Sequence, residues 1–186
     1  MKRAAPILLV LLALGAVAFW FWQKSQREHR FDNEIASAAR RYGVEPALVK
    51  AVVWRESGFS PLARGRAGEL GLMQLQEIAA QEWADDGHAT NFVHAHCLDA
   101  RTNTLAGARY LAKVLRRYTN TDNALPYALA DYNAGRGNVL KWLNGAAATN
   151  SAAFVEQIGF PGTRQYVLAI MQRRIHYLPE FVGEQR

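Results

Sequence analysis

The sequence contains a single cysteine, Cys97, among 186 residues. One thiol cannot form an intramolecular disulfide, so the chain is not a disulfide-stapled secreted scaffold. None of the first 30 residues is a cysteine that a lipid modification could use. Stability must therefore come from a packed core, and a chain of this length suffices for one compact domain.

Most of the chain also lacks an excess of charge of one sign. Residues 1–30 hold five basic residues and one acidic residue, whereas residues 31–186 hold 17 basic and 15 acidic residues. A body so close to neutrality lacks the basic surface that nucleic acid requires. We therefore expect no nucleic-acid partner, and a basic, anchored DNA-binding protein is only a distant alternative.

Alternating apolar and polar runs are absent, which excludes a conventional β domain. From Phe31 onward the periodicity is helical and predicts one all-α domain with short loops. Possible N-caps such as Asp122 and breaking glycines such as Gly135 and Gly137 delimit the helices. We expect helices over Asp32–Tyr42, Pro46 to about Glu56, Leu72–Trp83, Asp99–Tyr118 and Asp122–Tyr132, a short one capped by Ser151, and a last one from Pro161 or Thr163 to near Tyr177.

The one long hydrophobic run covers residues 4–22. At about 19 residues it is long enough to span a bilayer as a helix. Trp20 and Trp22 lie at its end, where interfacial aromatic residues are expected, and Lys24 and Arg27 follow. This pattern predicts an N-terminal transmembrane helix.

A cleavable signal peptide is the alternative, because Ala16-Val17-Ala18 resembles a cleavage site. The apolar run is longer than the usual signal core, however, and aromatic rather than small residues follow the site. We therefore favour an uncleaved anchor. Residues 1–30 are interpreted as the membrane anchor with a short basic linker, and residues 31–186 as one separate domain.

Glu56 stands out within Trp54-Arg55-Glu56-Ser57-Gly58-Phe59. It lies at the C-terminal end of a mostly apolar predicted helix, where the helix dipole is negative and apolar neighbours remove water. Both effects raise the pKa of a carboxyl group. A raised pKa suits a general acid that works near neutral pH.

Four residues of metal-binding type crowd one short segment: His88, His94, His96 and Cys97. Their chemistry suits zinc, but two histidines two apart are separated by about half a turn on a helix. No second cluster completes a ligand set. We expect neither a metal nor a cofactor.

Four short motifs follow one another on this helical background. They are Glu56-Ser57-Gly58-Phe59, Gly71-Leu72-Met73-Gln74, Ala130-Asp131-Tyr132-Asn133-Ala134-Gly135 and Thr163-Arg164-Gln165-Tyr166-Val167. In this order and spacing they resemble the lytic transglycosylase domain of the lysozyme-like superfamily. The resemblance extends over about Asp32 to Tyr177 and implies a helical, two-lobed fold with a peptidoglycan groove between the lobes.

The resemblance also implies roles for individual residues. Glu56 corresponds to the catalytic acid and base, and Tyr166 to a hydroxyl that points toward its carboxyl group. Tyr132 and Asn133 would bracket that carboxyl group and the N-acetyl group of the substrate. The remaining implied substrate-binding residues lie beside Glu56 or at a predicted helix start along the groove: Ser57, Gly71, Met73 and Gln74.

Three positions depart from the pattern of the family. Gly65 stands where the loop usually carries a serine near the N-acetyl group. Glu77 replaces a common proline, and Gly162 replaces an acidic residue. These departures leave Glu56 in place and concern substrate preference and the shape of one subsite.

Most glycosidases use two carboxylates, but Glu56 is the only carboxylate to which the resemblance gives a catalytic role. Glu69 and Asp131 are the candidates for a second one, and Asp131 should face away from Tyr132 because adjacent helical residues do not share a face. One carboxyl group suffices where the substrate supplies the nucleophile. In peptidoglycan the acetamido oxygen of N-acetylmuramic acid can attack its own C1, and closure by the C6 hydroxyl gives a 1,6-anhydro product.

The sequence thus predicts a membrane-anchored lytic transglycosylase that binds peptidoglycan glycan strands. Its anchor would lie in the inner (cytoplasmic) membrane and its domain in the periplasm or at the cell exterior. Two alternatives stay open. One is a hydrolase resembling goose-type lysozyme, which a well-placed Glu69 would favour. The other is a catalytically weak, wall-binding subunit of a larger envelope complex.

Overall fold

The computed structural model describes the backbone of residues 4–88 and 91–182, with side chains over 11–87 and 91–182. Its contacts divide the chain into two units, Met1–Phe31 and Asp32–Arg186. The second unit is all-helical, as predicted. Among the described residues no strand forms, and Leu70 makes only isolated bridges to Arg64 and Leu75.

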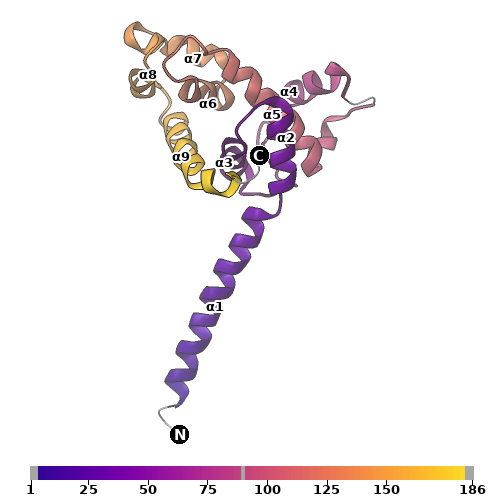
Figure 1. Ribbon diagram of the computed structural model, residues 1–186, viewed down its shortest axis with the longest axis vertical. Helices are drawn as coiled ribbons and strands as arrows, with labels where there is room; N and C mark the ends of the chain where they lie inside the picture. The colour runs from indigo at the N-terminus through magenta and orange to yellow at the C-terminus, as the bar shows by residue number, and fades with distance from the viewer. Residues whose placement is uncertain (1–3, 89–90, 183–186) are drawn as a thin grey trace. The chain divides into compact units, whose positions relative to one another are not determined.

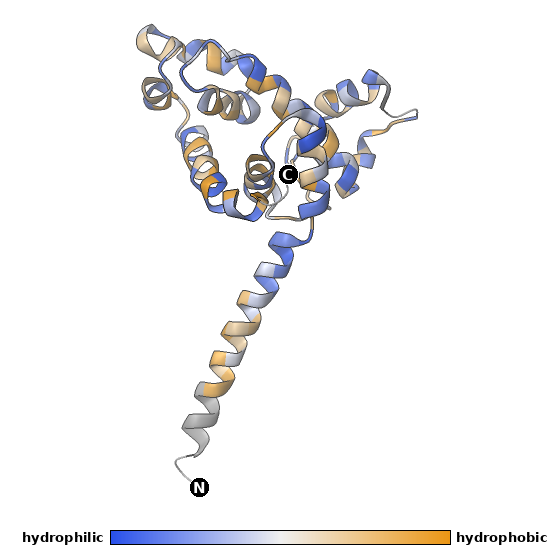
Figure 2. Cartoon of the chain, in the orientation of Figure 1, coloured by the Kyte–Doolittle hydropathy of each residue, from blue (hydrophilic) through white to orange (hydrophobic). Residues whose placement is uncertain are grey.

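The first unit is one helix, α1 (Ala4–His29). In Figure 2 the hydropathy colour along this helix changes from hydrophobic to hydrophilic toward its C-terminal end. Within the described part of the chain no helix has both the length and the apolar character needed to cross a membrane. The predicted span of residues 4–22 is therefore not confirmed, and its first seven side chains lie outside the described residues.

The second unit consists of α helices joined by short turns and single-turn helices (Figure 1). The α helices are α2 (Asp32–Tyr42), α3 (Pro46–Ser57), α4 (Glu77–Trp83), α5 (Ala100–Arg116), α6 (Ala124–Ala134), α7 (Arg136–Trp142), α8 (Ser151–Gln157) and α9 (Pro161–Tyr177). Shorter helical turns lie between or after these helices: η1 (Ala84–His88), η2 (His94–Leu98), η3 (Gly145–Ala148) and η4 (Leu178–Phe181).

Helix α3 is the buried centre of this unit, and every residue from Pro46 to Val53 is buried. It packs against α9, which lies beside it in Figure 1, while α2 packs on α5 and α5 on α6. Pro46 begins α3, and Gly58 ends it at φ 56° with its N–H bonded to the Trp54 carbonyl. An apolar helix bounded in this way was predicted, and it places Glu56 in its last turn.

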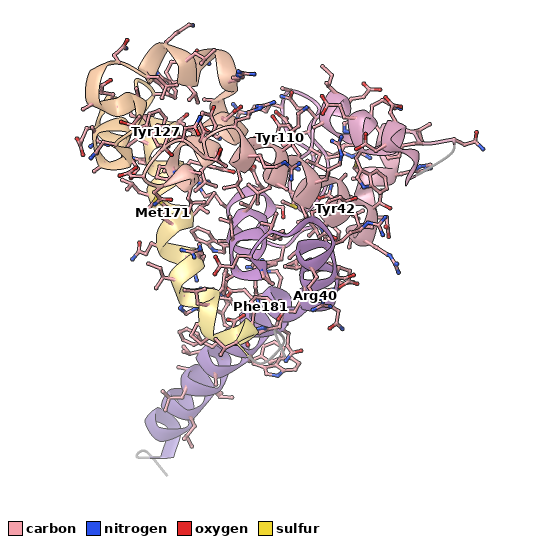
Figure 3. The ribbon with its side chains drawn as sticks, turned by 45° about the horizontal axis from the view of Figure 1, so that its top comes forward. Arg40, Tyr42, Tyr110, Tyr127, Met171 and Phe181 are labelled. Atoms are coloured by element: carbon pink, nitrogen blue, oxygen red, sulfur yellow. The ribbon has the colours of Figure 1, made fainter. Side chains whose placement is uncertain are left out.

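Helices α6, α7 and α8 gather into a group of their own (Figure 1). Tyr127, labelled in Figure 3, lies at its centre. Its ring stacks on Phe154 at 4.1 Å, and its hydroxyl donates to the Ala147 carbonyl at 3.0 Å. This fully buried tyrosine ties α6 to α8 and η3.

Several predicted element boundaries were wrong. Leu72–Trp83 is not one helix, because only Glu77–Trp83 is helical. Asn123 rather than Asp122 caps α6, since the Asn123 side chain accepts the Leu125 N–H and Asp122 accepts the Ser151 N–H. Asn150 rather than Ser151 caps α8.

Gly137 was expected to break a helix, but it lies within α7, a helix that was not predicted. Of the two glycines that follow α6, only Gly135 leaves helical geometry, at φ 81°. One glycine with positive φ is enough to separate α6 from α7.

Lys50 is a fully buried cation on α3. Its Nζ lies 2.7 Å from Asp32 Oδ1 and 2.5 Å from Glu180 Oε2. It also lies 4.9 Å from the Tyr177 ring centre and 5.6 Å from that of Phe181, which is labelled in Figure 3. Lys50 therefore joins α2, α3 and the C-terminal turn, and burial is tolerated because both carboxylates pair with it.

Replacing Lys50 by methionine should lower the free energy of unfolding by about 3 kcal/mol, because two carboxylates would lose their shared cation. Urea unfolding followed by tryptophan fluorescence measures this change. Lys141→Met, at an exposed site on α7, is the matched control and should unfold like the wild type. Equal stability of both variants would contradict the structural role of Lys50.

Candidate active site

Glu56 lies at the C-terminal end of α3 and is half-buried. Its Oε1 accepts a 2.6 Å hydrogen bond from the hydroxyl of Tyr166, a buried residue of α9. The guanidinium of Arg55 lies 5.5 Å from the Tyr166 ring centre. The predicted pairing of Glu56 with Tyr166 is thus present in the structure, and it joins α3 to α9 through two residues that are 110 positions apart in sequence.

The carboxyl group of Glu56 is tuned toward neutral pH. Burial raises its pKa from an ordinary value of 4.5 to about 7, against the opposing effects of the Tyr166 hydrogen bond and the Arg55 charge. The negative charge of Glu69 raises it further. A carboxyl group with this pKa can hold a proton near pH 7 and release it there, as general acid–base chemistry requires.

Glu56 opens onto a cavity of about 540 Å³. The cavity is bounded by the end of α3, the loop before α4, and parts of α4, α5 and α6. Three other predicted site residues line it: Gln74, Tyr132 and Asn133. The remaining lining residues are Glu69, Leu75, Gln76, Ala79, Tyr110, Asp131, Ala134 and Gly135.

The Gly71–Gln74 segment is a tight turn and not the helix start that was expected. Leu70 and Leu75 exchange backbone hydrogen bonds at 3.0 Å, and Gln74 has φ 47°. Gly71 has φ 78°, and a Cβ there would lie 2.1 Å from the Cys97 carbonyl oxygen. Glycine is therefore required at this position by both its φ and the close approach of η2.

Asn103 on α5 holds this turn from behind. Its side chain is fully buried and accepts the Met73 N–H at 2.7 Å. Its amide nitrogen donates to the carbonyls of Leu70 and Cys97, each at 2.8 Å. A buried amide is stable only when its polar atoms are paired in this way, so the turn and α5 fix one another.

Tyr132 and Asn133, at the end of α6, are both held by hydrogen bonds. The Tyr132 hydroxyl donates to the Met73 carbonyl at 2.8 Å, not to Glu56. Asn133 Oδ1 accepts from the Thr163 hydroxyl at 2.8 Å. With its oxygen occupied, the Asn133 amide has its N–H groups left to donate.

The predicted site residues Met73 and Ser57 do not line the cavity. Met73 is fully buried and packs against Gly107 on α5, where an added Cβ would lie 2.2 Å from its sulfur. The Ser57 hydroxyl donates back to the Val53 carbonyl at 3.2 Å, as hydroxyls near helix ends often do. Met73 therefore belongs to the core, and Ser57 to the end of α3.

The two candidates for a second carboxylate differ in their surroundings. Asp131 is buried, and its Oδ2 binds Arg117 Nη1 and the Tyr118 hydroxyl, both at 2.8 Å. Glu69 lines the cavity with Glu56, and its Oε2 accepts the Ala67 N–H at 3.0 Å. Of the two, Glu69 is the carboxylate whose charge acts on Glu56.

Asn103 and Tyr110 were not identified from the sequence. Tyr110, labelled on α5 in Figure 3, lines the cavity with its ring 5.3 Å from that of Tyr132. A signal for Asn103 was present, because it precedes Gly107 by four residues and Leu111 by eight. A polar residue on the buried face of a helix needs partners, and that requirement marks Asn103.

The histidine-rich segment has structural contacts in the described residues. His94 Nε2 lies 2.9 Å from the Leu75 carbonyl oxygen, and His96 Nδ1 accepts the Val93 N–H at 3.4 Å. Cys97 is fully buried, and burial raises the pKa of its thiol to about 12. The side chain of His88 lies outside the described residues.

The helices and loops that form this site match a known family. Residues 33–155 match the family described as "Transglycosylase SLT domain". The chain belongs to this family. Membership confirms the resemblance noted in the sequence. The matched residues run from α2 into α8 and include every element that lines the cavity.

Relatives of this SLT-domain chain are lytic murein transglycosylases. Membrane-bound lytic murein transglycosylase F of Desulfosudis oleivorans is 37% identical over 113 residues, which are 59% of this chain and 23% of the relative. Soluble lytic murein transglycosylase of Escherichia coli K12 is 30% identical over 167 residues, 85% of this chain and 25% of the relative. The chain thus spans about a quarter of the length of these relatives.

Solved structures of the family share the SLT-domain fold. An inactive Glu-to-Gln mutant of lytic transglycosylase Slt from Pseudomonas aeruginosa has a TM-score of 0.72 at 27% identity, over 80% of this chain and 24% of that one. A complex of the 70-kDa soluble lytic transglycosylase with bulgecin A has a TM-score of 0.75 at 26% identity, over 89% and 26%.

The raised pKa of Glu56 has a consequence for stability. Between about pH 4.5 and 7 the folded chain binds more protons than the unfolded chain, so the contribution of Glu56 is fully present below pH 4.5 and is lost as the pH rises through 7. Glu56→Gln should therefore be more stable than the wild type at pH 8, by up to about 3 kcal/mol.

Urea unfolding at pH 4 and pH 8 measures this difference, which should vanish at pH 4. Glu77→Gln, which changes an exposed carboxyl group on α4, is the control and should show no comparable difference between the two pH values. A Glu56→Gln variant that is no more stable than the wild type at pH 8 would contradict a raised pKa.

Proposed function

We propose that this SLT-domain chain is a peptidoglycan lytic transglycosylase that cleaves the β-1,4 bond between N-acetylmuramic acid and N-acetylglucosamine. The observation that carries the proposal is the cavity-lining Glu56, whose pKa is raised to about 7 beside the Tyr166 hydroxyl. The activity in the names of its relatives supports the assignment. So does the inactive Pseudomonas aeruginosa mutant, in which one glutamate is replaced by glutamine.

In the first step Glu56 acts as the general acid. Its proton passes to the glycosidic oxygen as the bond from that oxygen to C1 of the muramic acid breaks. The acetamido oxygen of the same sugar attacks C1, so the substrate supplies the nucleophile that a second carboxylate provides in most glycosidases. The Tyr166 hydroxyl holds the Glu56 carboxyl in place and stabilises the carboxylate that results.

In the second step the Glu56 carboxylate acts as the base. It takes the proton of the C6 hydroxyl while O6 attacks C1, and the bond between C1 and the acetamido oxygen breaks. The acetamido group is restored, a 1,6-anhydro ring forms without water, and Glu56 is protonated again. A carboxyl group with a pKa near neutrality serves both steps.

Substrate binding is assigned to polar groups that line the cavity. Asn133 can donate to the acetamido group, because Thr163 already occupies its oxygen. Gln74 donates to the Gly71 carbonyl at 3.0 Å, which leaves its own oxygen for a glycan hydroxyl. Gly71 contributes the turn, and the Tyr132 ring forms part of the wall.

A hydrolase is the second candidate, and the position of Glu69 favours it. Glu69 lines the same cavity as Glu56 and could activate a water molecule from there, as the second carboxylate does in inverting glycosidases. A wall-binding subunit is supported less well, because the Glu56–Tyr166 pair that the chemistry needs is present.

Product analysis separates these functions. We expect the full chain in mild detergent to release 1,6-anhydro-muropeptides from purified peptidoglycan, identified by mass spectrometry. Glu56→Gln should lower the rate about a thousandfold, because the acid and base are lost together, whereas Glu156→Gln, at an exposed site on α8, should leave it unchanged. Hydrated reducing ends would indicate the hydrolase, and retained activity in Glu56→Gln would exclude Glu56 as the catalytic group.

We also propose that residues 4–22 anchor the chain in the cytoplasmic membrane, with the domain in the periplasm or at the cell exterior, where peptidoglycan lies. The described part of this run exposes large apolar side chains such as Leu11, Leu14 and Trp20. Trp22 and Lys24 then provide the interfacial residues expected at its end.

Membrane extraction tests the anchor. The full chain should stay in the membrane fraction in alkaline carbonate and be released by detergent. Leu11→Lys combined with Leu14→Lys should move it to the soluble fraction, because two charges at the bilayer centre cost about 5 kcal/mol or more. Leu62→Lys, at an exposed site of the domain, is the control. Carbonate extraction of the wild type would rule out a spanning helix.

A further inference from the structure

The carboxylate of Glu69 occupies the space in which a side chain at position 65 would lie. An ideal Cβ on Gly65 would be 2.1 Å from Glu69 Oε2 and 2.9 Å from Gln74 Oε1. Gly65 does not have a positive φ, so its lack of a side chain is not required by the backbone. A side chain at position 65 would therefore displace the Glu69 carboxylate from where it lies.

A short turn holds Glu69 over Gly65. The Gly65 N–H donates to the Glu69 carbonyl at 2.8 Å, and the Ala67 N–H donates to Glu69 Oε2 at 3.0 Å. Gly68, with φ 91°, lets the chain reverse between them. The loop therefore binds both the backbone and the carboxylate of Glu69.

Held in this way, Glu69 presents an acceptor to the cavity that contains Glu56. An ionised carboxylate only accepts hydrogen bonds. Asn133 also lines the cavity. The hydrogen bond from Thr163 uses only the Asn133 oxygen, so the N–H groups of the amide stay available to a ligand. An acetamido group carries one N–H donor and one carbonyl acceptor, so these two side chains complement it.

We propose that Glu69 is the substrate-positioning residue for the acetamido group next to Glu56, accepting its N–H through the carboxylate that lies over Gly65. This inference rests on the proposed function for the identity of the sugar. Accepting the N–H draws negative charge onto the acetamido oxygen, because hydrogen bonds polarise one another along a chain. That oxygen is the atom that attacks C1, so Glu69 would both orient it and strengthen it.

Glu69 also acts on Glu56 through its charge, which raises the pKa of that carboxyl group in addition to the larger effect of burial. Removing the charge should lower the pKa of Glu56. Since the acid must be protonated, the limb of the pH–rate profile that falls at high pH should then move to lower pH. A purely structural role for Glu69 would not move this limb.

Four variants of the full chain in mild detergent test the proposal: Glu69→Ala, Glu69→Gln, Gly65→Ser, and Gly65→Ser combined with Glu69→Ala. Gly137→Ser is the matched control, because an added Cβ there meets nothing within 4 Å. Affinity is measured by NMR titration in a Glu56→Gln background, which prevents turnover. The probes are tetra-N-acetylchitotetraose and cellotetraose, which share a β-1,4 backbone but differ in the acetamido group.

Glu69→Ala should weaken binding of the acetamido sugar about tenfold to a hundredfold, the value of a hydrogen bond to a charged group, and leave cellotetraose unchanged. Glu69→Gln keeps an acceptor oxygen, so it should lose less affinity but still shift the pH–rate limb. Gly65→Ser should weaken binding because its Cβ displaces the carboxylate. The double variant should bind better than either single variant, since the serine hydroxyl then fills the vacated space.

Additive losses in the double variant, or equal losses for both probes, would overturn the proposal. So would unchanged affinity in Glu69→Ala. Product analysis of the wild type separates this result from the proposed function. Hydrated products together with the expected affinity pattern would remove the transglycosylase but keep acetamido recognition by Glu69. Anhydro products with unchanged affinity in Glu69→Ala would keep the transglycosylase but remove acetamido recognition by Glu69.

Discussion

The buried amide of Asn103 is the interaction on which the cavity depends. It receives the Met73 N–H and donates to the carbonyls of Leu70 and Cys97. Because the Met73 backbone is fixed in this way, its carbonyl is in place to accept the Tyr132 hydroxyl from α6. One side chain of α5 thus links the loop before α4 and η2, and through Met73 the end of α6. Without it the Met73 N–H would lose its buried partner, and the Leu70 and Cys97 carbonyls would each lose a hydrogen bond.

The second constraint is the cost of keeping Glu56 out of water. A carboxyl group with a pKa near 7 is less stable as an anion in the folded chain than in the unfolded chain. The surrounding core compensates for this cost. Helix α3 is buried along most of its length, α9 packs against it, and Lys50 ties both to the C-terminal turn. A rigid scaffold that carries one destabilised group is the usual arrangement of an active site.

The helices were predictable wherever local signals mark their ends. Pro46 and Gly58 delimit α3, and the apolar pattern between them needs no distant partner. The prediction of one helix over Leu72–Trp83 was wrong because Leu72 and Met73 continue a helical pattern in the sequence. In the structure Asn103, 30 residues beyond Met73, holds their backbone in a turn. The capping errors have a similar cause. Asp122 and Asn123 both suit an N-cap, and Asp122 is engaged by Ser151 from another segment.

The sequence by itself determined the all-α class and the family, because motif order and helix periodicity can be recognised in the chain itself, and it singled out Glu56 as a candidate. It also identified Gln74, Tyr132, Asn133 and Tyr166 through their motifs. Only the tertiary structure decided which side chains reach the cavity. Met73 and Ser57 point away from the cavity, and Asp131 forms an ion pair with Arg117. Glu69 lines the cavity, and its carboxylate lies against Gly65. These outcomes depend on burial and on partners far apart in sequence, which spacing along the chain does not encode.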